Sequence, residues 1–393
     1  MSKFIKITSK YLLLLFCLMV IPLKACAANA IQPGLGVNLM PNLVTSKYLY
    51  YVNDIGFDYV RTGLPWSSVE RKKGCYEWQE YDNLINLLQQ HNIKPMIIIG
   101  FNNPLYGARE DFTGVSTDEQ RRAFIKFSVA LVQRYKDRGI VWEIWNEPNI
   151  GEFWKLAPNP DNYSLMTKYT LKEIRKVAPK EVIITGGLAK PNSGEFINNF
   201  VKTGIINDVD AIGMHFYKSD GNTVVIPEWL NIQQINKNIT ETVKSKRTDK
   251  TAIPVVVSEL GYSTKWTNDS EYTQGVYIQR ELIINKANNI PISIIHTLMN
   301  FSYDRNGEEA NFGLINADFS PRQSYSMVKE VVQELKDADF VKIYPLKNSA
   351  DYAFEFKKAG KKIVFAWTVE DKHTVQIYGT DIDLSGAVQE IKW

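Results

Sequence analysis

The sequence predicts an α/β protein, a (β/α)8 TIM barrel followed by a small C-terminal antiparallel β module. Three observations predict this class. Strand-like and helix-like segments alternate from residue 34 to about residue 337, the strand-like segments number eight, and short runs of alternating polarity follow from residue 340. A chain of 393 residues can hold both parts, because one barrel of this kind takes about 250 residues.

Eight runs rich in β-branched and aromatic residues are the predicted strands. They cover residues 34–38, 58–62, 94–100, 140–147, 181–186, 209–217, 253–260 and 291–297. Helical patterns, with apolar residues three and four positions apart, lie between them at residues 77–91, 117–138, 161–177, 232–246, 270–288 and 322–336. Strand-then-helix order predicts a parallel barrel, whose functional residues come from the C-terminal ends of the strands.

The last segment predicts a different structure. Residues 341–344, 352–356, 362–367, 374–378 and 388–393 read as short strands separated by Gly, Asp, Asn and Lys turns. Fifty-odd residues without disulfides would be marginally stable alone, so we expect this module to pack on the barrel. The predicted organisation is a signal peptide at 1–30, the barrel at 31–337 and a β-sandwich-like module packed on the barrel at 338–393.

The N-terminal residues predict an export signal. Three lysines precede the apolar run 11–23, and residues 25–27 and 28–30 each offer an A-x-A cleavage site. The run is too short to favour a membrane span. We expect a periplasmic or secreted protein with no stable membrane insertion; lipoprotein anchoring at Cys26 is the alternative. Cleavage would leave Cys75 as the single cysteine, so no internal disulfide is expected.

Composition excludes several partners. The chain has 46 basic and 43 acidic residues and no basic block, which argues against nucleic acid as a partner. Its four histidines are not paired at ligand spacing, so we expect no metal and no cofactor. Aromatic residues make up 12% of the chain, and some of them are expected to line a cleft. We expect a monomer.

Two glutamates end two of the predicted strands. Glu147 follows the run Val141-Trp142-Glu143-Ile144-Trp145-Asn146, and Glu259 follows three consecutive valines and a serine. Glycoside hydrolysis needs such a pair, because one carboxyl group protonates the leaving oxygen while the other attacks or assists at the anomeric carbon. The sequence therefore predicts an enzyme that cleaves glycosidic bonds.

The motif Trp142-Glu143-Ile144-Trp145-Asn146-Glu147-Pro148-Asn149, with Glu259 and the later Asn311-Phe312-Gly313-Leu314, resembles the retaining glycoside hydrolases of clan A. It is most similar to family 39 and its exopolysaccharide-hydrolase relatives, with family 5 next. The resemblance implies that Glu147 is the general acid/base and Glu259 the nucleophile. It also implies substrate-site roles for Asn146, His215, Tyr217 and Arg61. Two further residues are candidates for substrate contact because of their places near the ends of the seventh and eighth strands: Trp266 and His296.

Several of these residues have both a functional and a structural interpretation. Asn146 would hydrogen-bond the sugar 2-hydroxyl or form a turn, and His215 would line the substrate site or belong to the core. Arg61 would hold the nucleophile ionised, and Tyr217 would donate a hydrogen bond to the nucleophile. Glu143 is expected to be structural, buried with a partner such as Arg61. Five aromatic residues that follow predicted strands could each belong to the core or line the cleft: Trp66, Trp154, Tyr262, Trp266 and Tyr303.

The eighth strand departs from the family pattern, since Asn300 and Phe301 stand where Tyr and Trp are expected. The preferred sugar is therefore left open. We expect a retaining hydrolase that cleaves β-linked polysaccharide or oligosaccharide, with a bacterial exopolysaccharide as one candidate. A transglycosylase and a non-catalytic glycan-binding protein on the same fold are the alternatives.

Overall fold

A computed structural model of the chain describes residues 30–393 except 156, 190–192, 217–224, 231 and 301–306. The predicted signal peptide up to residue 29, and with it Cys26, lies outside the described residues, as do Tyr217 and Tyr303. Across the described part of the chain, no helix has the length and apolar character needed to cross a membrane. Cys75 is an exposed free thiol.

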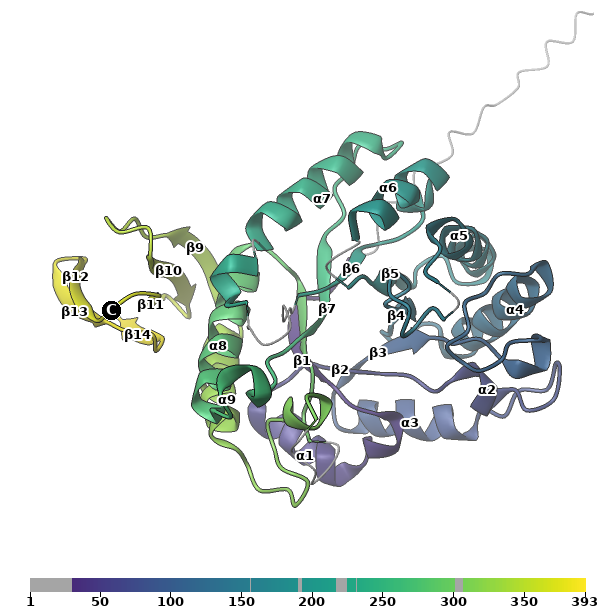
Figure 1. Cartoon of the computed structure of the whole chain (residues 1–393), viewed down its shortest axis with the longest axis horizontal. Coiled ribbons are helices and arrows are strands. Elements are labelled where there is room, and N and C mark those ends of the chain that lie inside the picture. Colours follow the sequence, from purple (N-terminus) through teal and green to yellow (C-terminus); the bar gives the residue numbers. More distant parts are fainter. Residues whose placement is uncertain (1–29, 156, 190–192, 217–224, 231, 301–306) are drawn as a thin grey trace, which may run out of the picture.

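Eight parallel strands form the central sheet (Figure 1), in the spatial order β5-β4-β3-β2-β1-β8-β7-β6. Single bridges from Ile184 to Ala211 and from Leu188 to Met214 join β5 to the β6 segment and close the barrel. The strands are β1 Gly34–Asn38, β2 Tyr59–Thr62, β3 Lys94–Ile99, β4 Val141–Asn146, β5 Val182–Gly187, β6 Ile212–His215, β7 Val255–Leu260 and β8 Ile292–Ile295. The predicted (β/α)8 class is confirmed.

Helices surround this sheet (Figure 1). They are α1 Ser46–Ile55, α2 Trp66–Val69, α3 Gln79–Gln90, α4 Asp118–Tyr135, α5 Pro160–Val177, α6 Ser193–Thr203, α7 Ile232–Lys246, α8 Glu271–Ala287 and α9 Gln323–Leu335. The cap of α4 is a capping box: Thr117 Oγ1 accepts from the Gln120 amide at 3.2 Å, and Gln120 Oε1 accepts from the Thr117 amide at 3.1 Å. Two hydrogen-bond donors that would otherwise be left at the helix start are thereby satisfied.

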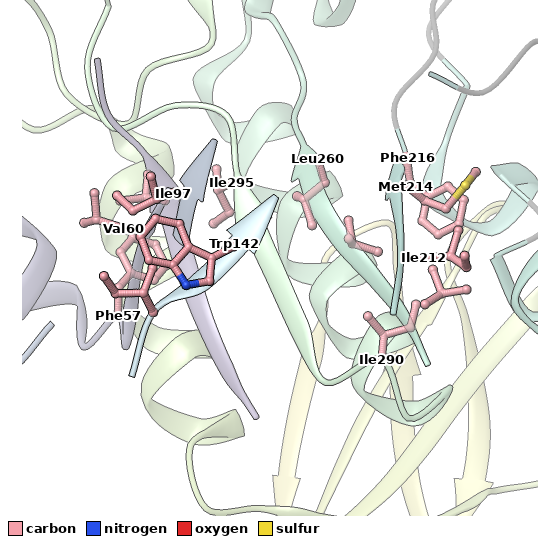
Figure 2. Packing of buried hydrophobic residues seen from close by; sticks show 14 of the residues in the cluster. Phe57, Val60, Ile97, Trp142, Ile212, Met214, Phe216, Leu260, Ile290 and Ile295 are labelled. Carbon is pink, nitrogen blue, oxygen red and sulfur yellow. The ribbon is translucent and has the colours of Figure 1, made fainter. Parts of the chain in front are cut away.

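Strand alternation divides the side chains of the barrel into two sets. Outward-facing residues pack under the helices in the main apolar cluster, and Figure 2 shows Val60, Ile97 and Trp142 among them. Inward-facing residues near the N-terminal strand ends form a separate apolar cluster, made of Tyr59, Met96, Val141, Ile184, Ala211, Val256, Ile292 and Ile294. Strand β1 contributes Gly36 there, where an added Cβ would lie 2.6 Å from Tyr59 Cβ and 2.7 Å from Ile294 Cδ1.

The C-terminal module contains a four-stranded antiparallel sheet in the order β14-β11-β10-β9 and a two-stranded hairpin, β12-β13. The strands are β9 Asp339–Ile343, β10 Asp351–Lys358, β11 Lys361–Thr368, β12 His373–Ile377, β13 Thr380–Leu384 and β14 Gln389–Lys392. Both faces of the sheet are covered. Phe354, Phe356 and Trp367 belong to the main cluster, whereas Val364 and Ala366 pack with residues of the hairpin.

The module is attached to the barrel beside α8 and α9 (Figure 1). Arg280 of α8 donates to the carbonyl oxygens of Thr368 and Gly386. Trp367 Nε1 donates to Glu228 Oε1 at 2.6 Å, and Glu228 lies on the short helix η4, Pro227–Leu230. Burial raises the pKa of the Glu228 carboxyl group, although Arg280, 3.4 Å away, opposes that rise.

Candidate active site

Arg61 lies at the centre of the polar end of the barrel, with only 1% of its surface exposed. Its Nε donates to Glu143 Oε2 at 2.6 Å, and its Nη2 donates to Asn146 Oδ1 at 2.7 Å. Its Nη1 donates to Glu259 Oε1, which also accepts from Asn38 Nδ2 at 3.0 Å. One guanidinium therefore joins β2 to β4 and β7 and stabilises the Glu259 carboxylate by a charge-assisted hydrogen bond.

Glu143 lies beneath this arrangement and is fully buried. Its Oε1 accepts from the Gly187 amide at 2.9 Å while its Oε2 holds Arg61. A buried charge is tolerated when it is paired and hydrogen-bonded. The expected structural role of Glu143, with Arg61 as its partner, therefore agrees with these contacts.

Two consecutive residues of the β4 end, Asn146 and Glu147, both line the cleft. Regular alternation would put them on opposite faces. The backbone breaks that alternation, because Trp145 has φ 74° and Glu147 has φ 43°. Trp145 packs against Phe124 and Trp154 instead of entering the cleft. Non-glycine residues at positive φ carry strain that often accompanies a functional site.

The direction of the side chain of Glu259, the nucleophile candidate, depends on a second irregularity, in β7. Met214 pairs with Val257 and His215 pairs with Glu259, so β7 uses two residues where β6 uses one. The pairing with β8 shifts in the same stretch, between Val257 and Leu260. This β-bulge brings Glu259 into the cleft, while Leu260 joins the outer apolar cluster. Bulges commonly re-aim a side chain in this way beside active sites.

His215 lies between the two carboxylates. Its Nδ1 is 2.7 Å from Glu147 Oε1 and 3.6 Å from Glu259 Oε2. Burial lowers the pKa of the imidazole, but the charges of Glu259 and Glu147 outweigh burial, so the pKa is raised above the ordinary value. The other edge of the ring faces Gly187, where an added Cβ would lie 2.0 Å from His215 Nε2.

The carboxylates of Glu147 and Glu259 are close together. One oxygen of Glu147, one oxygen of Glu259 and a ring nitrogen of His215 all lie within 4.8 Å of one another. All three side chains are more than nine-tenths buried. Carboxyl groups about 5–5.5 Å apart are typical of retaining glycosidases, whereas inverting enzymes separate them by about 6.5–9.5 Å. The separation fits the retaining arrangement.

These residues open into a cleft of about 780 Å³. One wall is aromatic: the rings of Phe101 and Phe112 are 4.5 Å apart, and Phe153 lies 5.5 Å from Phe112. Glu152 and Glu309 also line the cleft. Burial raises the pKa of Glu152, and the negative charges of Glu147, Glu309 and Glu259 raise it further.

The structure brings most of the predicted site residues together. Arg61, Asn146, Glu147, His215, Glu259, Trp266 and His296 all line this cleft. Trp266 packs edge-on against Phe312 at 5.0 Å, and His296 Nδ1 lies 3.3 Å from Asn38 Nδ2. Tyr217 lies outside the described residues, so its role stays a prediction. Trp66, Trp154 and Tyr262 belong to the core, each at most 2% exposed.

Sequence reasoning missed several cleft residues. Asn38 ends β1 and could have been found by the strand-end rule that identified Glu147 and Glu259. Phe112, Phe153 and Glu152 come from loops, and Glu309 begins the single-turn helix η6, Glu309–Asn311; in such segments no periodicity signals the direction of a side chain. A second cavity of about 400 Å³, at the N-terminal ends of the strands, contains none of the predicted site residues.

Comparison with known proteins identifies the family. Residues 27–295 match the model of the cellulase family, glycosyl hydrolase family 5. The chain belongs to this family. The predicted membership of clan A is thus confirmed, with family 5 as the matching model and family 39 represented among similar solved structures.

Two curated relatives match over short segments. The aryl-phospho-beta-D-glucosidase BglA of Bacillus subtilis is 32% identical over 102 residues, which are 24% of this chain and 21% of the relative. A beta-xylosidase of Geobacillus stearothermophilus is 28% identical over 191 residues, 42% of this chain and 37% of the relative. The chain therefore spans only about a fifth to just over a third of the relatives it matches.

Solved structures support the fold over nearly the whole chain. A family 39 glycoside hydrolase from Bacteroides cellulosilyticus WH2 aligns with a TM-score of 0.76 and 24% identity, covering 91% of this chain and 80% of that one. A monomeric beta-xylosidase from Caulobacter crescentus CB15 aligns with a TM-score of 0.63 and 17% identity, covering 90% and 80%. At these identities the alignments establish the shared fold.

Proposed function

We propose that this member of glycosyl hydrolase family 5 is a retaining β-glycoside hydrolase that acts by double displacement. The observation that carries the proposal is the pair Glu147 and Glu259, whose nearest oxygens lie within 4.8 Å across a cleft at the C-terminal strand ends. Their different surroundings support different roles. Glu259 contacts the cation Arg61, whereas Glu147 contacts the imidazole of His215.

In the first step, a Glu259 oxygen attacks the anomeric carbon while Glu147 gives a proton to the leaving oxygen. The Glu147–His215 pair, joined at 2.7 Å, keeps a proton beside that oxygen. The negative charge of Glu259 disappears as the covalent bond forms. In the second step, Glu147 takes a proton from water, whose oxygen attacks the anomeric carbon and releases Glu259 as a carboxylate.

The proposed substrate is a β-linked oligosaccharide or polysaccharide, such as a bacterial exopolysaccharide. The curated relatives are named as an aryl-phospho-beta-D-glucosidase and a beta-xylosidase, and the aromatic wall of the cleft offers ring faces to sugar C–H groups. Export to the periplasm or the medium, proposed from residues 1–30, would bring the enzyme to such a polymer.

The test compares single variants on aryl glycosides. Glu259→Ala should lose turnover on every substrate, because no nucleophile remains. Glu147→Ala should keep activity on substrates with good leaving groups, which need no protonation, and azide should restore its turnover with formation of a β-glycosyl azide. Glu173→Ala, on the exposed face of α5, is the matched control. Equal losses in the two cleft variants on activated substrates would contradict the separate roles.

We also propose that residues 338–393 stabilise the barrel rather than supply catalytic groups. The support is the buried contact of Trp367 and Arg280 with Glu228. Deleting residues 340–393 should lower the melting temperature and the solubility by exposing apolar surface of α8 and α9. A soluble truncated protein with unchanged melting temperature would show instead that the module is an independent unit.

A further inference from the structure

Three side chains of types that can bind a metal ion converge at the base of the cleft, although they lie far apart in the sequence. Glu147, His215 and Glu259 come from the ends of β4, β6 and β7, and 68 residues separate the first two. Metal motifs recognisable in sequence have their ligands a few residues apart. In the folded chain the corresponding atoms lie within 4.8 Å of one another.

We propose that Glu147, His215 and Glu259 form a binding site for a divalent transition-metal ion such as Zn²⁺, and that the bound ion excludes the substrate. The ion would take one oxygen from each carboxylate and Nδ1 of the imidazole. Three protein ligands and one open position are a common Zn²⁺ arrangement. Binding itself does not depend on the proposed hydrolase function; competition with substrate does.

The orientation of each ligand supports this site. Gly187 closes off the Nε2 edge of the His215 ring, since even a Cβ there would lie 2.0 Å from Nε2, so Nδ1 is the nitrogen that faces the carboxylates. Arg61 and Asn38 hold Glu259 Oε1. The other oxygen, Oε2, is the one that lies 3.6 Å from Nδ1, so it can bind the ion while Arg61 keeps its contact.

The distances from His215 Nδ1 to the two carboxylate oxygens fit a small ion after modest side-chain movement. Bonds of about 2.0–2.2 Å in tetrahedral geometry put neighbouring ligand atoms about 3.3 Å apart. The separations of Nδ1 from Glu147 Oε1, 2.7 Å, and from Glu259 Oε2, 3.6 Å, lie on either side of that value. Two carboxylates also balance the charge of a dication.

The ligand set favours one class of metal. An imidazole nitrogen suits Zn²⁺, Cu²⁺ or Ni²⁺, whereas Ca²⁺ and Mg²⁺ prefer six or more oxygen ligands and keep water. The ion would lie between the two carboxylates, which is where the reacting anomeric carbon must be. Inhibition should therefore be competitive.

The experiment measures Zn²⁺ binding by titration calorimetry on the full mature chain without an affinity tag, with Mg²⁺ and Ca²⁺ as comparison ions. We expect one Zn²⁺ per chain, no comparable binding of Mg²⁺ or Ca²⁺, and at least tenfold weaker binding in each of Glu147→Gln, His215→Gln and Glu259→Gln. His373→Gln is the matched control, because His373 and Asp351 form another histidine–carboxylate pair, 2.9 Å apart on the module.

Inhibition gives the second measurement. Zn²⁺ should inhibit hydrolysis of aryl β-glycosides competitively, with an inhibition constant equal to the dissociation constant, and EDTA should restore the rate. Zn²⁺ binding that persists in the folded Glu147→Gln and His215→Gln variants, or that is lost in His373→Gln, would overturn the site. A protein that binds Zn²⁺ as expected but cleaves no glycoside would overturn the proposed function alone; active protein that binds no Zn²⁺ would overturn only the metal site.

Discussion

The two ends of the barrel interior are built from the same strands and have opposite chemistry. Near the N-terminal ends, β2 and β4 point Tyr59 and Val141 inward, and these join an apolar cluster. Two residues further along, the same faces present Arg61 and Glu143, which are buried and bonded to each other. The inward-facing positions of β2 and β4 thus supply both an apolar layer and, two residues further along, a charged layer.

The difference teaches where stability and chemistry are separated in this fold. Apolar residues near the N-terminal ends of the strands stabilise the fold because they are removed from water. At the C-terminal end of the barrel interior, each buried charge opposes folding unless it is paired. The charged side chains there are arranged to contact Glu259 and Glu147. Substitutions at the two ends should therefore have different signatures in stability and in activity.

The largest effect is expected for Arg61→Met. It leaves Glu143 and Glu259 buried without their shared cation, and removing one partner of a buried pair costs about 3–5 kcal/mol. Urea unfolding should show this loss, and turnover on aryl glycosides should fall with it. Arg61→Lys keeps the charge but not the fork of donors, so it should recover more stability than activity. A fully active Arg61→Met protein would contradict the function of the charged layer.

Ile294→Ala tests the other end. Truncating this buried side chain should lower the free energy of unfolding by about 2–5 kcal/mol through lost burial and a cavity. Because Ile294 belongs to the apolar cluster near the N-terminal strand ends, kcat/KM of the folded protein should not change. Ile294→Val should cost about 0.5–1.5 kcal/mol. A large drop in kcat/KM at temperatures where the variant is folded would show that the two ends are coupled.

Gly187→Ala should affect activity through His215. An added Cβ would lie 2.0 Å from Nε2, so the ring must move and lose its contact with Glu147. Loss of one hydrogen bond to a charged group costs about 1.5–3 kcal/mol, which corresponds to a roughly ten- to hundredfold lower rate. Gly151→Ala is the control, because nothing lies within 4 Å of its added Cβ. Equal kinetics in both variants would refute the positioning of His215 by Gly187.

The smallest effect is expected on the module, where the partly exposed His373 contacts the buried carboxylate of Asp351. The hydrogen bond to Asp351 raises the pKa of His373, so the folded state binds the proton more tightly than the unfolded state. This stabilisation is fully present below about pH 6.5, the ordinary histidine value, and is lost as pH rises through the folded pKa. The melting temperature of His373→Gln should therefore fall below that of the wild type only at acidic pH; a difference that grows with pH would reverse the sign.

The sequence predicted the elements well where one face of each is apolar. Strand β1 and helix α7 have the predicted bounds, and β4 and β7 differ from them by one or two residues. The helices α1, α2 and α6 and the strand β13 were not predicted. Strand β13, Thr380–Leu384, carries polar residues at exposed positions and follows a tight turn, so it lacks the apolar run that identified the others.

The strand ends predicted where the candidate glutamates lie, but not the direction of their side chains or the loop residues of the cleft. Glu147 and Glu259 follow apolar runs, and this placed them correctly at the cleft. Their direction was not readable, because it depends on the positive φ of Trp145 and on the bulge of β7. Neither feature involves a glycine or a proline that would reveal it. The loop residues of the cleft depend on tertiary packing and carried no local signal.

The bulge in β7 also determines how the direction of Glu259 would respond to a change in strand length. Its cause is one residue, since β7 uses one position more than both of its neighbours between Val257 and Leu260. Val257 belongs to the outer apolar cluster, so in a strand of regular alternation Ser258 would face the cleft and Glu259 would turn toward the helices. Removing Ser258 would place Glu259 directly after Val257, and its carboxylate would again face the cleft. A one-codon deletion at Ser258 should therefore leave this carboxylate in place, because a regular strand without Ser258 and a bulged strand with it present the same side chain.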